Sequence, residues 1–325
     1  DTGVEQEIRV IRRTYNRLGL SMLAYMLIYQ LFSLPVMYVV MAFWPQLLQS
    51  SWFSVFVGEF VQYLVAMPVA WLMMRTAHTP LCPLTKRRLS AMNFLRFFLV
   101  SVGLMFLFNL VGTGLNELIS MVKGSPAGNI VEQSISTYTL AQSVLLTVVS
   151  APIGEELVFR KWIYRCVGSY GSTAYILTSA CMFMLMHGNI IQYPYAFAVG
   201  AVFAWVYLQT GSIWTTILLH AAVNFVGGVL PLIGVNFEPL LLLQALLYLF
   251  CAAYAISAFW KLLRRKLLRE DTPSAERSES SLPEGSLDAA LLNPGMLLFT
   301  VASFTMAGYV ISVSYTHLRA HETAA

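Results

Sequence analysis

Two adjacent glutamates, Glu155 and Glu156, lie inside an apolar run, and Arg160 follows about one helical turn later. Two further apolar runs each carry one histidine, His187 and His220. A charged side chain at the centre of a membrane span costs about 2.5–3.5 kcal/mol on insertion scales, so such residues are functional candidates. Carboxylates and imidazoles that meet inside a bilayer would indicate proton-transfer chemistry.

The spacing of these charges predicts different roles for the two glutamates. Residues four positions apart share a helix face, so Glu156 and Arg160 can pair and partly neutralise each other. Glu155 lies about 100° further round the helix and faces a different partner. One carboxylate can therefore act as a general base, while the other stays ionised as a structural anchor.

Each group also has a purely structural explanation when it is taken alone. The Glu-Glu-x-x-x-Arg string can be an interfacial ion pair with its charged ends directed to the membrane surface. His187 can be a hydrogen-bonded histidine at a helix end, and His220 with Asn224 can join helices through polar contacts. The His-Glu-x-x-His spacing of zinc proteases is absent, so we expect no catalytic metal and no cofactor.

The composition identifies the elements that must position these residues. The chain is 58% hydrophobic and 11% charged, with a mean hydropathy of +0.67, whereas soluble domains carry about 25% charged residues. Only helices or closed barrels satisfy the backbone in lipid, and ten-residue alternating strands are not seen. We predict an all-α polytopic transmembrane bundle of eight or nine spans, at about 18–44, 52–74, 94–121, 139–165, 174–193, 195–210, 213–233, 239–261 and 291–311.

Lys and Arg cluster before the first predicted span and after the second, fourth and eighth, which places every strong cluster on one side. The positive-inside rule then predicts an integral membrane protein with a cytoplasmic N-terminus, in the cell membrane if the source is bacterial. The net charge of +4 reflects this asymmetry, and we expect no nucleic-acid partner. The four cysteines show no CxxC spacing and are not expected to form a disulfide framework.

Three motifs occur in order in separate apolar runs: Glu-Glu-x-x-x-Arg at 155–160, Phe-x-x-x-His at 183–187 and His-x-x-x-Asn at 220–224. This arrangement resembles the CAAX prenyl endopeptidase and bacteriocin-processing family (CPBP, or Abi), which consists of intramembrane glutamate proteases. The resemblance covers roughly residues 139–233.

The resemblance implies an intramembrane endopeptidase that acts on a membrane-associated peptide or protein, which can be lipidated. It also implies membrane lipids as partners. By position in the motifs, Glu155 would activate water with help from His187, and His220 with Asn224 would stabilise the oxyanion. Glu156 and Arg160 would orient these groups. A non-catalytic bacteriocin-immunity or scaffold protein of the same fold remains an alternative, as does a proton-coupled transporter.

The motifs also divide the chain. We predict three spans without a motif in 1–138 and a CPBP/Abi-like catalytic core in 139–238. Further spans follow in 239–311, with a flexible cytoplasmic linker at 262–290, and residues 312–325 are predicted to be a non-native tail. No signal peptide is expected, because the first apolar run is too long, and the first residue, Asp1, suggests that the natural start is missing.

One difficulty concerns depth in the membrane. At about 1.5 Å per residue, Glu155 and His220 lie roughly 12–15 Å from the basic side, but His187 lies roughly 20 Å from it. A later start of the span that carries His187, a tilt of that span or a break near Gly188 would bring the three residues to one level.

Overall fold

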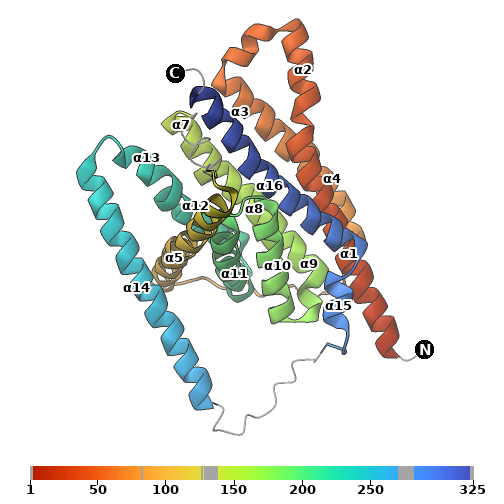
Figure 1. Ribbon diagram of the computed structural model, residues 1–325. Helices are drawn as coiled ribbons and strands as arrows, with labels where there is room; N and C mark the ends of the chain where they lie inside the picture. Colours follow the sequence, from red (N-terminus) through yellow and green to blue (C-terminus); the bar gives the residue numbers. More distant parts are fainter. Residues whose placement is uncertain (1–2, 82, 126, 128–137, 270–281, 323–325) are drawn as a thin grey trace.

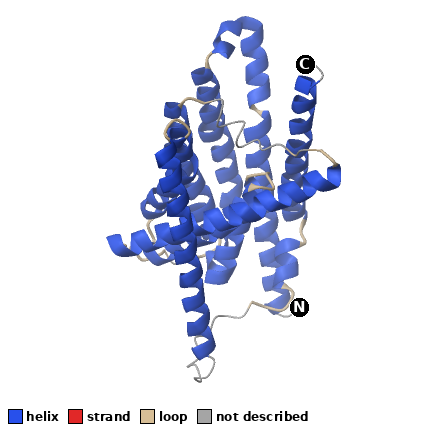
Figure 2. Cartoon of the chain, turned by 60° about the vertical axis from the view of Figure 1, so that its left-hand side comes forward, coloured by secondary structure: helices blue, strands red, loops and turns tan. Residues whose placement is uncertain are grey.

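The structure is a computed structural model that describes residues 3–81, 83–125, 127, 138–269 and 282–322, and the side chains of 266–269 and 313–322 lie outside the description. The described residues form helices joined by short connections and contain no strand (Figure 2). The predicted all-α membrane bundle is therefore confirmed.

Seven helical segments are long and apolar enough to cross a membrane, within the part of the chain that the structure describes. They are α1–α2 (Gly3–Leu31 and Ser33–Phe43), α3–α4 (Ser51–Phe60 and Met67–Met74), α5 (Ala91–Lys123), α7–α9 (Leu140–Ser143, Ala151–Glu156 and Ile163–Val167), α12–α13 (Ile213–Asn224 and Leu230–Gly234), α14 (Glu238–Arg269) and α16 (Pro294–Glu322) (Figure 1).

The two remaining predicted spans form a hairpin, α10 (Ser172–Met186) and α11 (Gln192–Thr210). The 15 residues of α10 reach about 22 Å, which is less than the roughly 30 Å hydrocarbon core. The loop that follows α4 contacts the C-terminal end of α11, because the Arg87 amide donates to the Thr210 carbonyl at 2.8 Å. The same loop meets the segment before α10, since the Thr79 amide donates to the Arg165 carbonyl at 3.1 Å.

The turn of this hairpin lies part-way along α16. The Tyr193 hydroxyl is 2.6 Å from the Ser303 hydroxyl, which in turn donates to the Leu185 carbonyl. Asn189, Ile191 and Tyr193 are buried. The predicted spans at 174–193 and 195–210 are therefore not among the seven candidate spans of the described residues, and their connection is buried in the protein. Irregular backbone at this depth is tolerated where protein surrounds it.

Helix α5 lies across the bundle: it is viewed nearly along its axis in Figure 1, while the other long helices run up the page. Two glycines allow its close crossings. A Cβ at Gly112 would lie 2.1 Å from the Ile191 carbonyl oxygen, and one at Gly103 would lie 2.2 Å from the Cys251 carbonyl oxygen. Only a residue without a side chain fits at these crossings, which bring α5 against the hairpin turn and against α14.

The helix that carries the two glutamates is not a regular α-helix. It begins with a capping box at Thr139 and Gln142 and contains π-helical stretches at Val144–Ser150 and Leu157–Trp162. Pro152, which has no N–H to donate, lies between them. Such π-turns often mark functional positions. Here they flank the segment that bears Glu155.

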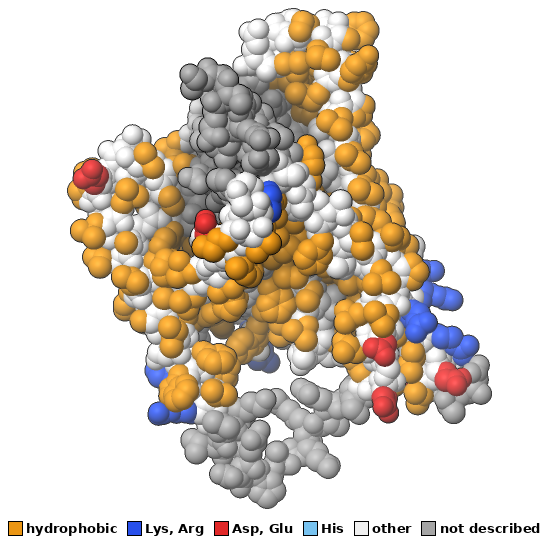
Figure 3. All heavy atoms as spheres, viewed as in Figure 1, with side chains coloured by type: hydrophobic (Ala, Val, Ile, Leu, Met, Phe, Trp, Pro, Cys, Tyr) orange, Lys and Arg blue, Asp and Glu red, His pale blue; other side chains and the backbone are white. Residues whose placement is uncertain are grey.

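The face of the bundle drawn in Figure 3 is mostly apolar, and most of the Lys and Arg side chains visible there lie toward its lower edge. Arg17 illustrates how these charges are held, because its guanidinium donates to the Thr76 carbonyl, just beyond α4. The long apolar surface and the gathering of charge at one end are what a membrane protein requires.

The C-terminal part differs from the prediction. Helix α14 continues to Arg269, and α15 (Ser286–Leu291) packs on α1, so residues 262–269 and 286–290 are helical instead of a flexible linker. The middle of the predicted linker, 270–281, lies outside the described residues. The backbone of α16 is helical through residue 322, while the prediction of a non-native tail at 312–325 stays a prediction.

Candidate active site

Glu156 and Arg160 form a fully buried ion pair. Arg160 Nε donates to Glu156 Oε2 at 3.0 Å, and a terminal guanidinium nitrogen donates to Oε1 at 3.2 Å. Both side chains are 0% exposed. A two-pronged pair of this kind gives the charge-assisted hydrogen bonds that a buried carboxylate needs. The pairing predicted from the four-residue spacing is present.

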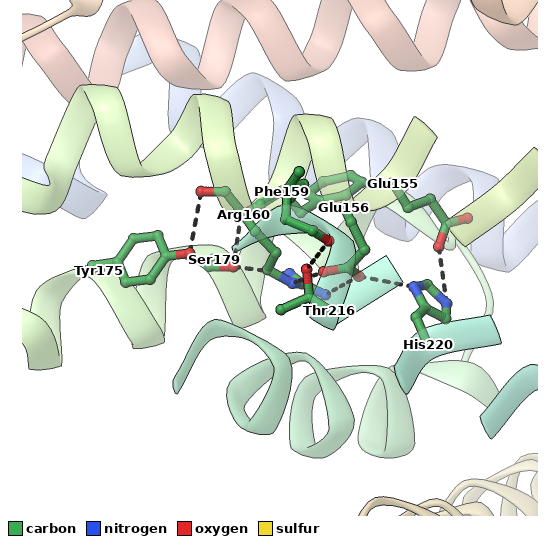
Figure 4. A network of polar contacts seen from close by, with 9 residues as sticks. Glu155, Glu156, Phe159, Arg160, Tyr175, Ser179, Thr216 and His220 are labelled. Carbon is green, nitrogen blue, oxygen red and sulfur yellow. Dashed lines mark hydrogen bonds and ion pairs between the residues drawn. The ribbon is translucent and has the colours of Figure 1, made fainter. Parts of the chain in front are cut away.

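Arg160 has further partners that hold its plane (Figure 4). Its other terminal nitrogen donates to the Ser179 hydroxyl at 2.8 Å. The guanidinium carbon lies 4.7 Å from the ring centre of Phe183 and 5.6 Å from that of Phe203. Tyr175 donates to the Arg160 carbonyl at 3.1 Å. The rings and hydroxyls of α10 and α11 therefore hold this cation in one orientation.

His220 of α12 joins the two glutamates. Its Nδ1 lies 2.8 Å from Glu156 Oε1, and its Nε2 lies 3.6 Å from Glu155 Oε2. A carboxylate paired with a guanidinium accepts hydrogen bonds, so Nδ1 carries the proton and donates it to Glu156. The other ring nitrogen, Nε2, then faces Glu155, and the tautomer is fixed by the hydrogen bond on the opposite side of the ring.

Glu155 faces a cavity of about 300 Å³. Its side chain is 25% exposed, whereas that of Glu156 is fully buried. Besides Glu155, the polar side chains that line the cavity are Tyr25, Tyr29, Gln30, Gln62, His187 and Gln192. Of the two adjacent glutamates, Glu155 is therefore the one that can reach a molecule bound in this cavity.

The close approach of the α3–α4 helix to this cavity depends on Gly154, the residue before Glu155. A Cβ at Gly154 would lie 2.9 Å from the Tyr63 hydroxyl and 3.0 Å from Gln62 Nε2. The absence of a side chain there allows Gln62 to lie beside the segment that bears the two glutamates.

His187 lies at the end of α10 and lines the same cavity. Its Nδ1 is 2.7 Å from the Phe183 carbonyl oxygen, and because a carbonyl only accepts, Nδ1 must carry the proton. Nε2 of the neutral ring is then a proton acceptor. Among the described residues, no hydrogen bond joins His187 directly to Glu155. Gly188 follows with a φ of +55° and turns the chain, which corresponds to one of the three alternatives that the depth argument left open.

Asn224 lies one turn after His220 but does not line the cavity. Its Nδ2 donates to the Thr147 carbonyl at 2.8 Å, in the first π-helical stretch of the glutamate helix. The structure therefore brings Glu155, Glu156, Arg160 and His220 into direct contact, places His187 across the cavity and uses Asn224 to join α12 to the glutamate helix.

The cluster does not have the donor geometry of a metal centre. In the part of the chain that the structure describes, no group of three His, Cys, Asp or Glu side chains is placed to hold a metal ion. Both oxygens of Glu156 are already bonded to Arg160.

Comparison with protein-family models gives a match to residues 137–226, and the matching family is described as Type II CAAX prenyl endopeptidase Rce1-like. Residues 137–226 are an Rce1-like domain. This confirms the resemblance for that part of the chain and agrees with the CPBP/Abi assignment. Neither the curated proteins nor the solved structures include a match to this chain.

All six predicted site residues lie inside the Rce1-like domain, but part of the cavity wall does not. Tyr25, Tyr29 and Gln30 belong to α1, Gln62 lies between α3 and α4, and Met306 belongs to α16. Sequence reasoning missed these residues, because a single Tyr, Gln or Met in an apolar span carries no motif and is ordinary at a membrane interface.

Proposed function

We propose that the protein is an intramembrane endopeptidase that hydrolyses a peptide bond of a membrane-associated or lipidated substrate by glutamate-assisted attack of water. One observation carries the proposal: a partly exposed carboxylate, Glu155, shares a cavity with His187, and His220 is held beside it by the buried Glu156–Arg160 pair. The Rce1-like domain supports a protease.

In the first step, Glu155 accepts a proton from a water molecule, while Nε2 of His187 accepts a hydrogen bond from the same water. The water oxygen forms a bond to the carbonyl carbon of the substrate, and the electron pair of the C=O double bond moves to its oxygen. A positioned general base of this kind contributes about 10²–10⁴ in rate.

The resulting oxyanion needs hydrogen-bond donors. His220 can donate through Nε2 when its ring is protonated, and Glu156 stabilises that protonated ring from the other side. Asn224, to which the resemblance gives the same role, does not line the cavity and is bonded to the Thr147 carbonyl, so we do not assign it as a donor to the oxyanion. The tetrahedral intermediate then collapses: the C–N bond breaks, and the departing amine takes the proton that Glu155 holds.

The substrate class follows from the family description, which names CAAX prenyl endopeptidases. We therefore propose a prenylated C-terminal peptide as the first substrate to test, with an unmodified peptide of the same sequence beside it. The basic end of the bundle would face the cytoplasm, where such tails are found, with the start of α1 on that side.

The test is cleavage by purified protein in proteoliposomes, followed by mass spectrometry of the new peptide termini. Glu155→Gln keeps the shape and removes the base, so kcat should fall by about 10²–10⁴. Glu117→Gln is the matched control, because Glu117 is an exposed carboxylate on α5 that does not line the cavity. Cleavage by Glu155→Gln at the wild-type rate would refute the mechanism.

A further inference from the structure

Three glutamine side chains line the cavity together with Glu155 and His187. Gln30 lies near the end of α1 and is exposed, Gln62 lies between α3 and α4 and is buried, and Gln192 is the first residue of α11. They come from three different helices. Only Gln192 belongs to the Rce1-like domain.

The contacts of Gln30 and Gln192 do not explain them as structural links between helices. Gln192 Nε2 donates to the Tyr195 hydroxyl at 2.8 Å, which is a bond within its own helix, and its Oε1 and second N–H remain available. Gln30 has no hydrogen-bond partner among the described residues. A side-chain amide without a hydrogen-bond partner raises the free energy of the protein when its surroundings are apolar. The free amide groups of Gln30 and Gln192 are therefore suited to hydrogen bonds with a bound molecule.

The chemistry of the arriving partner follows from its position. A peptide that enters a membrane-embedded cavity leaves water, and each of its backbone N–H and C=O groups must find a protein partner. An extended peptide presents both kinds of group. A glutamine amide both donates and accepts, so a single side chain can satisfy a neighbouring N–H and C=O.

The placement of Gln30 and Gln192 suits this purpose, while Gln62, which is hydrogen-bonded to Tyr25, forms the wall beside Glu155. Gln62 Nε2 lies 3.0 Å from the Cβ position of Gly154, directly beside Glu155. Gln192 follows the His187–Gly188 turn and lines the cavity from the start of α11. Gln30 and its exposed neighbour Tyr29 mark the mouth of the cavity on α1.

We propose that Gln30 and Gln192 bind the backbone of an extended substrate peptide whose scissile bond is presented to Glu155. The peptide enters past α1, where Gln30 makes the outermost contact. This inference rests on the proposed peptidase function and assigns part of its substrate site to helices outside the Rce1-like domain.

The experiment measures binding separately from cleavage. A fluorescently labelled CAAX-type peptide is titrated against full-length Glu155→Gln protein in proteoliposomes, and the dissociation constant is read from fluorescence anisotropy. Gln30→Leu and Gln192→Leu, each added to Glu155→Gln, should weaken binding roughly 3- to 10-fold, the value of one lost neutral hydrogen bond. Gln209→Leu is the matched control, because Gln209 is an exposed glutamine of α11, the helix of Gln192, and does not line the cavity.

A modified peptide tests whether the contact is to the backbone. N-methylation at successive positions removes one N–H at a time, and one position should weaken binding by a similar factor in Glu155→Gln protein. That penalty should vanish when Gln192→Leu or Gln30→Leu is also present.

The outcomes separate the two proposals. Equal binding by all glutamine variants, or an N-methyl penalty that persists in both of them, overturns the glutamine assignment even if the wild-type protein cleaves the peptide. Glutamine-dependent binding without cleavage by the wild-type protein supports the binding site and refutes the peptidase function. Absence of both binding and cleavage refutes both.

Discussion

Replacing Arg160 by Met tests whether the buried Glu156–Arg160 ion pair stabilises the folded protein around the site. The change removes two hydrogen bonds to Glu156 and one to Ser179. Glu156 stays 0% exposed with His220 as its remaining partner. Removal of one partner from a buried pair costs about 3–5 kcal/mol, because the other charge is left uncompensated.

For domains of 150–250 residues, 1 kcal/mol shifts the unfolding temperature by about 2–4 °C. Since this chain is longer, we use about 2 °C per kcal/mol, and Arg160→Met should lower the midpoint by roughly 6–10 °C. The double variant Glu156→Gln, Arg160→Met has no uncompensated charge. Its midpoint should return to within about 2 °C of the wild-type value, because replacing a whole buried pair is often neutral.

The assay is thermal unfolding followed by intrinsic fluorescence, with all variants in the same detergent. Arg12→Met is the control, since Arg12 is exposed and surface substitutions usually change stability by less than about 0.5 kcal/mol. The double variant should be stable but slow, because His220 loses the carboxylate that fixes its tautomer. A double variant as unstable as Arg160→Met would refute the reasoning that an unpaired charge causes the loss.

Three further predictions address the elements around this pair. Gly112→Ala should destabilise the protein by about 1–3 kcal/mol, because the new Cβ would overlap a backbone carbonyl of the hairpin turn. Gly114→Ala on the same helix is the control: its Cβ meets nothing within 4 Å, so it should be neutral in the same unfolding assay. His187→Gln should lower kcat by about 10²-fold or more with little change in KM, as measured on the cleaved peptide; an unchanged kcat would remove it from the mechanism. Asn224→Leu should lower stability by about 1 kcal/mol through the lost bond to the Thr147 carbonyl, and a variant as stable as the wild type would show that this bond is unimportant.

The local part of the site could be predicted because helix geometry fixes it. Glu156 and Arg160 meet for the reason that any residues four apart on a helix meet, even though the turn between them is π-helical. The contact of Glu156 with His220 spans 64 positions and could be expected only from the order of the motifs. A single sequence does not say which helix faces meet.

The nine predicted spans exceed the seven helical segments that are long and apolar enough to cross a membrane among the described residues. The α10–α11 hairpin is as free of charge as a span, so the absence of charge alone does not distinguish it from two spans. The α1 wall of the cavity was missed for a related reason. Tyr25 and Gln30 can be recognised as site residues only in the folded chain, where they line the same cavity as Glu155.

The inward-turning hairpin has a consequence for how the protein is assembled. Lipid cannot satisfy the backbone of its turn, and the groups that cover it come from α5 at Gly112 and from α16 at Ser303. Because α16 lies C-terminal to the hairpin, the turn reaches its final environment only after the later helix has been inserted. His187 ends the first arm of that hairpin, so the proposed catalytic histidine takes its final position only once α16 covers the turn.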